Sequence, residues 1–207
     1  MSERKIAEEF FVESVVHPTD FSPESDEAFA HALAVALLRQ TEFTLLHAGN
    51  QPIGEDEWTK FPRIRKTLGR WNLLAKGSPR SAIFEDLSLR VTKANLQGRT
   101  LPAIVDYLDV RPTDLIVLAT EGREGLARFF RSSTAEVIAR RSRTMTLFVP
   151  HGCRGFVSLD NGYVTLKRIL VPVDRDPNPT AALLFATRAA SMAGGEIVDI
   201  EMLRVGD

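Results

Sequence analysis

A strand, a helix and a second strand follow one another within the first fifty residues, and this order constrains the fold more than any other feature. Val12–His17 is a short β-branched run, typical of a strand buried on both faces. Alanines and leucines recur at helical spacing over Ala28–Leu38, and Phe43–His47 is a second apolar run. Ser22 and Pro23 suit a helix N-cap and a first helical position. This β-α-β unit predicts two parallel strands joined by a right-handed crossover.

The same alternation continues to about residue 150. Further strands are expected at Leu89–Ala94, Asp114–Thr120 and Thr146–Val149, with helices at Leu101–Leu108 and Ser133–Arg141. Strands that alternate with helices in this way predict an α/β fold with a doubly wound parallel sheet of five strands. Ligands of such sheets bind beyond the carboxyl ends of the strands, where the winding direction reverses. A site is therefore expected at the loops after the first and fourth strands.

The stretch from Asn50 to Leu74 has a different composition. Trp58, Phe61 and Trp71 lie among lysines and arginines, and prolines interrupt the run. We expect an irregular loop and a short amphipathic helix here. The aromatic side chains either line a ligand or partner site or, as we prefer, anchor the segment to the sheet.

The end of the chain repeats its beginning. Lys167–Gly206 matches the opening β-α-β unit, with Asp174 in the place of Asp20. We therefore expect a complete domain at 1–150, a linker at 151–166 and the first half of a second domain at 167–207. Half a domain buries too little surface to stand alone. Either the chain is a truncated tandem protein, which we favour, or the half packs on the first domain or on a neighbouring protomer.

Charge and composition limit the partners and the compartment. The formal net charge is -1, so nucleic acid and membrane are not expected as partners, and only local patches could attract them. The single cysteine, Cys153, excludes an internal disulfide and is interpreted as a bystander thiol. The charged N-terminus lacks the apolar core of a signal peptide, and the longest apolar stretch is too short to span a bilayer. We expect a cytoplasmic protein.

Three segments together resemble the universal stress protein family: HPTDFS after the first strand, DLIVLATEGREGLARFFRSSTAEVIARRS, and the closing TLFVP. The resemblance covers residues 12–150 as a whole domain and 167–206 as half of another. It implies the parallel sheet expected above and, in nucleotide-binding members, an Asp after strand one and a glycine signature after strand four. That signature is Gly, two residues, Gly, nine residues, Gly, then Ser or Thr.

Mapped onto this chain, the resemblance implies a ligand site at Asp20, Ala119, Gly122, Ser132 and Ser133, with Thr134 next. The local excess of positive charge adds Arg123, which flanks the loop. Gly122 and Ser133 match the signature, whereas Ala119 and Ser132 stand where the family has glycine. If position 132 requires a positive φ, a serine there is strained by roughly 1 kcal/mol or more. The implied ligand is ATP or AMP, with Mg²⁺ accompanying ATP; a domain that keeps the fold and has lost or changed its ligand is equally open.

The residue types in this signature suit an anion. Glycines let backbone N–H groups approach phosphate oxygens, and Ser133 with Glu136 forms a capping-box pattern at a helix start, whose positive end attracts negative charge. Arg123 either reaches a phosphate or is simply a solvated surface cation, and the sequence leaves both open. Arg140–Arg143 is instead interpreted as a solvated helix face with i,i+4 pairs. Asp20 either positions an adenosine group or a metal-bound phosphate, or simply closes a turn as Asx residues do.

The sequence shows no pattern that demands an enzyme. The four histidines lack metal-ligand spacing, and there is neither a nucleophile elbow nor a Walker loop. At most, slow ATP hydrolysis is expected, because phosphoryl transfer depends mainly on positioning and electrostatics. The leading hypothesis is a stress-response regulatory protein that binds an adenine nucleotide. The alternative is a dimerisation or interaction module without nucleotide, and a homodimer is expected through Thr146–Val149 or through the partial repeat.

Overall fold

The fold is described from a computed structural model of the chain. It describes residues 12–50, 58–120, 134–153, 155–174, 176, 178–191, 193 and 197–204. The chain divides into two compact units. The larger unit contains residues 12–155 and 159–162, and the smaller contains residues 156–158 and 163–207. Each unit is described by itself.

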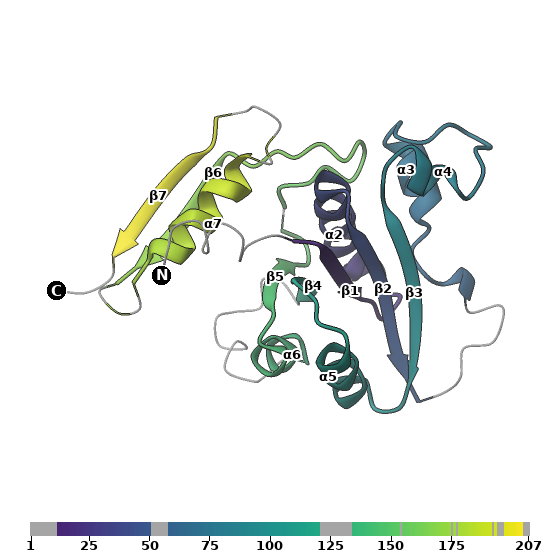
Figure 1. Ribbon diagram of the computed structural model, residues 1–207, viewed down its shortest axis with the longest axis horizontal. Coiled ribbons are helices and arrows are strands. Elements are labelled where there is room, and N and C mark those ends of the chain that lie inside the picture. Colours follow the sequence, from purple (N-terminus) through teal and green to yellow (C-terminus); the bar gives the residue numbers. More distant parts are fainter. Residues whose placement is uncertain are drawn as a thin grey trace. The chain divides into compact units, whose positions relative to one another are not determined.

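The larger unit is built on a parallel sheet of five strands in the order β3-β2-β1-β4-β5 (Figure 1). The strands are β1 (Ser14–Pro18), β2 (Glu42–Gly49), β3 (Arg90–Gln97), β4 (Leu115–Thr120) and β5 (Met145–Pro150). All four neighbouring pairs are parallel. The predicted α/β class, with a doubly wound five-stranded sheet, is confirmed, and each of the five predicted strands overlaps an observed one.

Helices cover both faces of this sheet. They are α2 (Asp26–Arg39), α3 (Ile64–Arg70), α4 (Ala82–Glu85), α5 (Thr100–Val110) and α6 (Thr134–Ser142). Successive side chains of a strand point to opposite faces. Val16 of β1 packs with α5 and α6, whereas the neighbouring His17 ring lies 6.3 Å from the Phe29 ring of α2. Helix α2 therefore covers the face opposite to α5 and α6.

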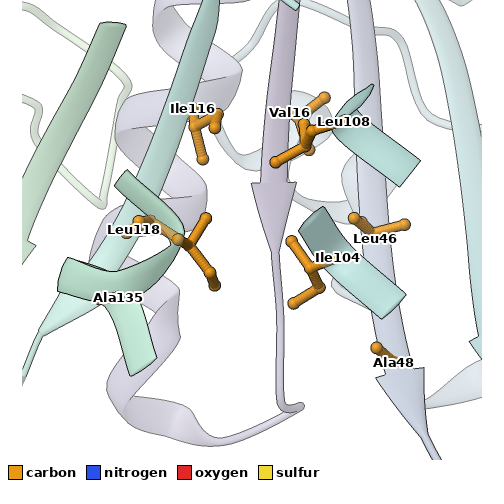
Figure 2. Packing of buried hydrophobic residues seen from close by; sticks show 9 residues of the cluster. Val16, Leu46, Ala48, Ile104, Leu108, Ile116, Leu118 and Ala135 are labelled. Carbon is orange, nitrogen blue, oxygen red and sulfur yellow. The ribbon is translucent and has the colours of Figure 1, made fainter. Parts of the chain in front are cut away.

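The core on the α5 and α6 face is a single apolar cluster (Figure 2). Figure 2 shows Ile104 and Leu108 of α5 over Val16 and Leu46, and Ala135 of α6 beside Leu118 on β4. Each fully buried Val, Leu or Ile side chain contributes about 1.5–3 kcal/mol to the stability of the fold relative to an exposed one. The cluster ties α5 and α6 to three adjacent strands and so fixes the position of the α6 N-terminus next to β4.

In the connection from β1 to α2, Ser22 and Pro23 hold the predicted N-cap and first positions, but of a 3-10 turn and not of the regular helix. A 3-10 turn, η1 (Pro23–Ser25), precedes α2, and Ser22 stands before this turn without a side-chain capping hydrogen bond. The Ser22 N–H donates instead to Asp20 Oδ1 at 3.0 Å. The Ser22 hydroxyl also hydrogen-bonds to the Asp20 carboxylate, and the regular helix begins at Asp26.

The segment between β2 and β3 holds the expected short helix, α3, with Phe61 before it and Trp71 after it. Both of these rings are buried, so the interpretation of the aromatic residues as anchors is confirmed for them. Trp58 differs, because 42% of its surface remains exposed. The Trp71 Nε1–H donates to the Leu159 carbonyl at 3.0 Å, which ties residues 159–162 to this segment.

The smaller unit contains a second β-α-β arrangement. It consists of β6 (Arg168–Val173), α7 (Thr180–Ser191) and β7 (Asp199–Arg204), and the two strands pair in parallel. Strand β6 and helix α7 begin at residues 168 and 180, against 14 and 26 for β1 and α2, so both are offset by 154 residues. The partial second unit predicted from the sequence repeat is therefore present as a two-stranded sheet with one helix.

One face of this small sheet lacks the helices that cover its counterpart. By repeat and strand register, Leu170 corresponds to Val16 and Leu203 to Leu46. Val16 and Leu46 are buried under α5, whereas Leu170 is 54% exposed and Leu203 is 43% exposed. Within the part of the smaller unit that the structure describes, no α5 or α6 equivalent covers these positions. Across all described residues, the helices are too short or too polar to span a membrane.

Candidate functional site

The sheet reverses its winding direction at β1, which pairs with β2 on one side and β4 on the other. Asp20 follows β1, and Ala119 and Thr120 end β4, so these residues lie beyond the same edge of the sheet. Thr134 is the first residue of α6 and is exposed. This brings Asp20, Ala119 and Thr134 to the switch point, where doubly wound sheets bind ligands.

Four predicted site residues lie outside the described residues. They are Gly122, Arg123, Ser132 and Ser133. The glycine signature of the loop after β4 therefore stays a prediction. The helix it leads into is observed at Thr134–Ser142, close to the predicted Ser133–Arg141. Glu136 pairs with Arg140 at 2.6 Å, which confirms the expected i,i+4 pairing on the solvated face of α6.

Asp20 presents an ionised carboxylate at this edge. Its side chain is exposed and accepts the Ser22 N–H. Partial burial by itself raises the pKa of Asp20, but hydrogen bonds from the Ser22 hydroxyl and from the backbone outweigh that effect, so the pKa lies below its usual value. The carboxylate is thus charged at neutral pH. It closes the turn and also offers lone pairs to a hydroxyl, an amino group or a cation.

The residue after Asp20 has an unusual backbone that sequence analysis missed. Phe21 has φ 66°, the left-handed region that bulky residues avoid. Its N–H donates to Thr19 Oγ1 at 3.1 Å, and its ring stacks on His47 with centroids 4.0 Å apart. His47 in turn donates from Nδ1 to the Thr19 carbonyl at 2.8 Å. These contacts hold the loop after β1 against the end of β2. The sequence gives no signal for this conformation, because phenylalanine has no preference for a positive φ.

His17 is a second feature that the sequence did not reveal. The side chain is completely buried, and its Nδ1–H donates to the Val117 carbonyl of β4 at 2.9 Å. Burial lowers its pKa from 6.5 to about 4, although the hydrogen bond to Val117 and the charge of Asp20 act in the opposite direction. Its Nε2 is buried and has no hydrogen-bond partner among the described atoms. His17 therefore links β1 to β4 as a neutral ring directly before the switch point.

No metal centre is found in the part of the chain that the structure describes. There, no three His, Cys, Asp or Glu side chains come together as metal ligands would. What the edge offers is a carboxylate acceptor at Asp20 and the N-terminus of α6, which favours negative charge. Such an arrangement suits the binding of a ligand with both a neutral polar part and an anionic part.

Comparison with known proteins agrees with the fold. The sequence model described as the universal stress protein family matches residues 12–150. The chain belongs to the universal stress protein family. The matched range covers the sheet of the larger unit from before β1 to the end of β5. The resemblance carried by Asp20 and the β4 motif is thereby confirmed at the level of the family.

Individual relatives are distant. Universal stress protein MJ0531 of Methanocaldococcus jannaschii is 27% identical over 140 residues, which are 65% of this chain and 80% of that protein. A solved universal stress protein in complex with cAMP is 21% identical, with a TM-score of 0.46 over 68% of this chain and 98% of that one. A universal stress protein from Archaeoglobus fulgidus DSM 4304 is 17% identical, with a TM-score of 0.49 over 69% of this chain and 45% of that one.

Proposed function

We propose that this universal stress protein is a stress-response regulator that binds an adenine nucleotide, ATP or AMP, at the loop after β4. The observation that carries the proposal is the position of an ionised Asp20 at the switch point, level with the end of β4 and the start of α6. The sequence of the loop after β4 supports the proposal with a partly matched glycine signature, as the resemblance to the family implies.

Charge assigns the two ends of the ligand. The Asp20 carboxylate repels a bare phosphate, so it faces the hydroxyls or amino group of the adenosine, or a Mg²⁺ ion that accompanies ATP. The phosphates lie toward Gly122, Arg123 and Ser133, next to the positive end of α6. Ala119 and Ser132 each add a side chain where the family signature has glycine, and we propose that the loop accommodates both.

Calorimetry on protein stripped of nucleotide tests this function. ATP, with and without Mg²⁺, and AMP are titrated into the wild type and into Asp20→Asn. Loss of a charged hydrogen-bond acceptor is expected to weaken binding by about 10- to 100-fold. Asp174→Asn is the matched control, because the repeat gives Asp174 the position after β6 that Asp20 has after β1. It should leave binding unchanged.

The proposed phosphate end is tested separately. Arg123→Ala is expected to weaken binding about tenfold, the size of one charged hydrogen bond. Ser132→Gly restores the family residue and should not weaken binding. Absence of heat with both nucleotides, together with an unchanged melting temperature in millimolar ATP, would refute the nucleotide proposal.

A second candidate function is an interaction module that dimerises. Strand β5 lies at the edge of the sheet, and its Phe148 is exposed. An edge strand with an exposed aromatic ring favours pairing with a second copy of the chain. Light scattering over a range of concentrations should then show a dimer, and Phe148→Lys should shift it to monomer. Val110→Lys changes an equally apolar exposed residue at the end of α5 and is expected to leave the dimer intact.

The tandem organisation is part of this proposal. We place a complete domain at 1–150, a linker at 151–166 and the first half of a second domain at 167–207. The equal offset of β6 and α7 from β1 and α2 supports the division, and so does the exposure of Leu170 and Leu203 at positions that α5 covers in the first domain.

A further inference from the structure

The segment that joins β2 to β3 is far more basic than the rest of the chain. Between Trp58 and Lys93 the sequence contains nine Lys and Arg residues against two Asp and Glu residues, in a chain whose formal net charge is -1. The acidic run at 55–57 that precedes it still leaves an excess of four positive charges over 55–93. The overall charge therefore hides a local patch of the kind that attracts polyanions.

Helix α3 presents its cations as a stripe. Its buried side chains are Ile64, Thr67 and Leu68. Lys66 and Arg70 of the helix are exposed, and so is Arg63, the N-cap residue directly before it; the three follow the i, i+3, i+7 spacing of one face. Along the helix axis they span about 10 Å, which covers more than one phosphate of a nucleic acid strand. Arg70 also lies near the carboxylate of Asp26, so the freest positive charges are those of Arg63 and Lys66.

Just before this stripe in the chain, an exposed indole is connected through Phe61 to one further cation, Lys93. The Trp58 ring stacks on the buried Phe61 ring, with centroids 5.4 Å apart and an interplanar angle of 15°. The Lys93 ammonium lies 5.3 Å from the centroid of Phe61. Phe61 thus packs against one side of the indole, and 42% of Trp58 remains exposed to solvent. Exposed aromatic rings of this kind are the surfaces on which proteins stack single-stranded bases.

Lys93 and Arg80 lie close enough to repel each other. Burial lowers the pKa of Lys93, and the charge of Arg80 lowers it further. The Arg65 guanidinium holds the loop before Arg80 in place by donating to the carbonyls of Ser78 and Pro79. Among the described residues, no carboxylate is paired with Lys93 or Arg80. An anion bound between the two cations would relieve this repulsion.

We propose that this part of the protein, the basic surface, binds a single strand of nucleic acid. The basic surface consists of Trp58, Arg63, Lys66, Arg70, Arg80 and Lys93. One base stacks on Trp58, and the cations neutralise phosphates of the backbone without reading the sequence. Figure 1 places α3 and α4 together and away from α5 and α6.

The chemistry of the patch favours this partner over an anionic membrane. A helix that binds a membrane surface inserts an apolar face. The apolar side chains of α3, Ile64 and Leu68, are already buried in the protein, so this helix offers a partner its cations and no apolar face. An acidic peptide would satisfy the charges but would leave the supported, exposed indole without a function. The proposal departs from the expectation drawn from overall charge, and it does not depend on nucleotide binding at the β4 loop.

Fluorescence anisotropy with labelled single-stranded oligouridine and oligothymidine of about 12 nucleotides tests the proposal. The wild type should bind both, and its affinity should fall between about 50 and 200 mM salt. Arg63→Glu with Lys66→Glu should weaken binding at least tenfold and reduce the salt dependence. The matched control is Arg99→Glu with Arg111→Glu, two exposed cations that flank α5 and give the same change in net charge.

Stacking is tested by Trp58→Ala, for which about a tenfold loss is expected from the removal of one base contact. Circular dichroism confirms that each variant is folded. Binding should persist in millimolar ATP and in Asp20→Asn, which separates this surface from the proposed nucleotide site. The proposal is overturned if anisotropy does not change up to about 100 µM protein, the weak limit of non-specific binding. It is also overturned if the control variant loses as much affinity, or if phosphatidylserine vesicles are bound in preference to the oligonucleotides.

Discussion

The buried His17 makes the stability of the larger unit depend on pH in a way that can be calculated. Its pKa is about 4 in the folded protein, against 6.5 for an ordinary histidine. Below pH 6.5 the unfolded chain takes up a proton that the folded protein refuses. The contribution of His17 to stability is therefore complete above pH 6.5 and is lost as the pH falls toward about 4.

The size of the loss follows from the pKa difference. Each pKa unit corresponds to about 1.4 kcal/mol, so a change from 6.5 to about 4 amounts to about 3 kcal/mol over the whole range. At about pH 4.5, most of this, about 2–3 kcal/mol, has been lost. Asp20 does not interfere, because its pKa lies below the usual value and its own contribution is lost only at lower pH. His31 is also buried with a lowered pKa and adds a loss of the same sign.

The substitution His17→Asn isolates the contribution of His17 to the pH dependence of stability. The asparagine amide can donate to the Val117 carbonyl as Nδ1 does, but it does not titrate. At neutral pH the variant is expected to be less stable by about 1–3 kcal/mol, because the imidazole volume is lost from the core. Between about pH 7.5 and 4.5, however, it should lose about 2–3 kcal/mol less than the wild type. The contribution of His31 cancels in this comparison.

Urea unfolding followed by tryptophan fluorescence provides the free energies at each pH. Val16→Ala, which removes buried volume from the neighbouring residue without removing a titratable group, is the control and should keep the pH dependence of the wild type. If His17→Asn has the same pH dependence as the wild type, the burial of a neutral His17 ring is not the cause, and the argument is refuted.

Two glycines that pack against buried rings give further predictions for stability. Gly162 has φ +73°, and an added Cβ would lie 2.5 Å from the Trp71 ring. Gly77 also has a positive φ, +84°, but an added Cβ there would meet no atom within 4 Å. Gly162→Ala should therefore destabilise the protein by about 1–3 kcal/mol more than Gly77→Ala. The opposite order in urea unfolding would contradict the contact with Trp71. A Cβ on Gly155 would lie 2.2 Å from the His31 ring, so Gly155→Ala is expected to cost about 1–3 kcal/mol. A melting temperature equal to that of the wild type would show that residue 155 is not packed against α2.

Local patterns predicted the elements of the larger unit well, because the burial of each element is reflected in its own residues. The continuous apolar run at the start of β4 is buried, and the alanine- and leucine-rich stretch of α2 is buried over Ala28–Ala36. The same patterns placed the candidate site, since parallel strands and short crossovers leave one choice for the switch point. Resemblance to the family added Asp20 and the β4 loop as site residues. The family and the fold are confirmed, and the site stays a prediction.

Other features depend on neighbours that are distant in the sequence. Phe21 accepts a positive φ because the ring of His47, from another strand, stacks on it. By contrast, the Asx turn between Asp20 and Ser22 joins residues two apart, and the local sequence does indicate it. The Phe21 conformation is not visible in a local window, because it depends on a contact with a residue of another strand.

By itself, the sequence determined that the chain forms a parallel α/β sheet, that its opening unit recurs near its end, and that Asp20 and the β4 loop are the place to look for a ligand. Only the tertiary structure decided that His17 is a neutral ring wedged between β1 and β4, and that the cations of α3 face solvent while its apolar residues are buried. The physical reason is that periodicity records how much of an element is buried. Charge state, pairing and exposure depend on the particular atoms that folding brings within a few ångströms of each side chain.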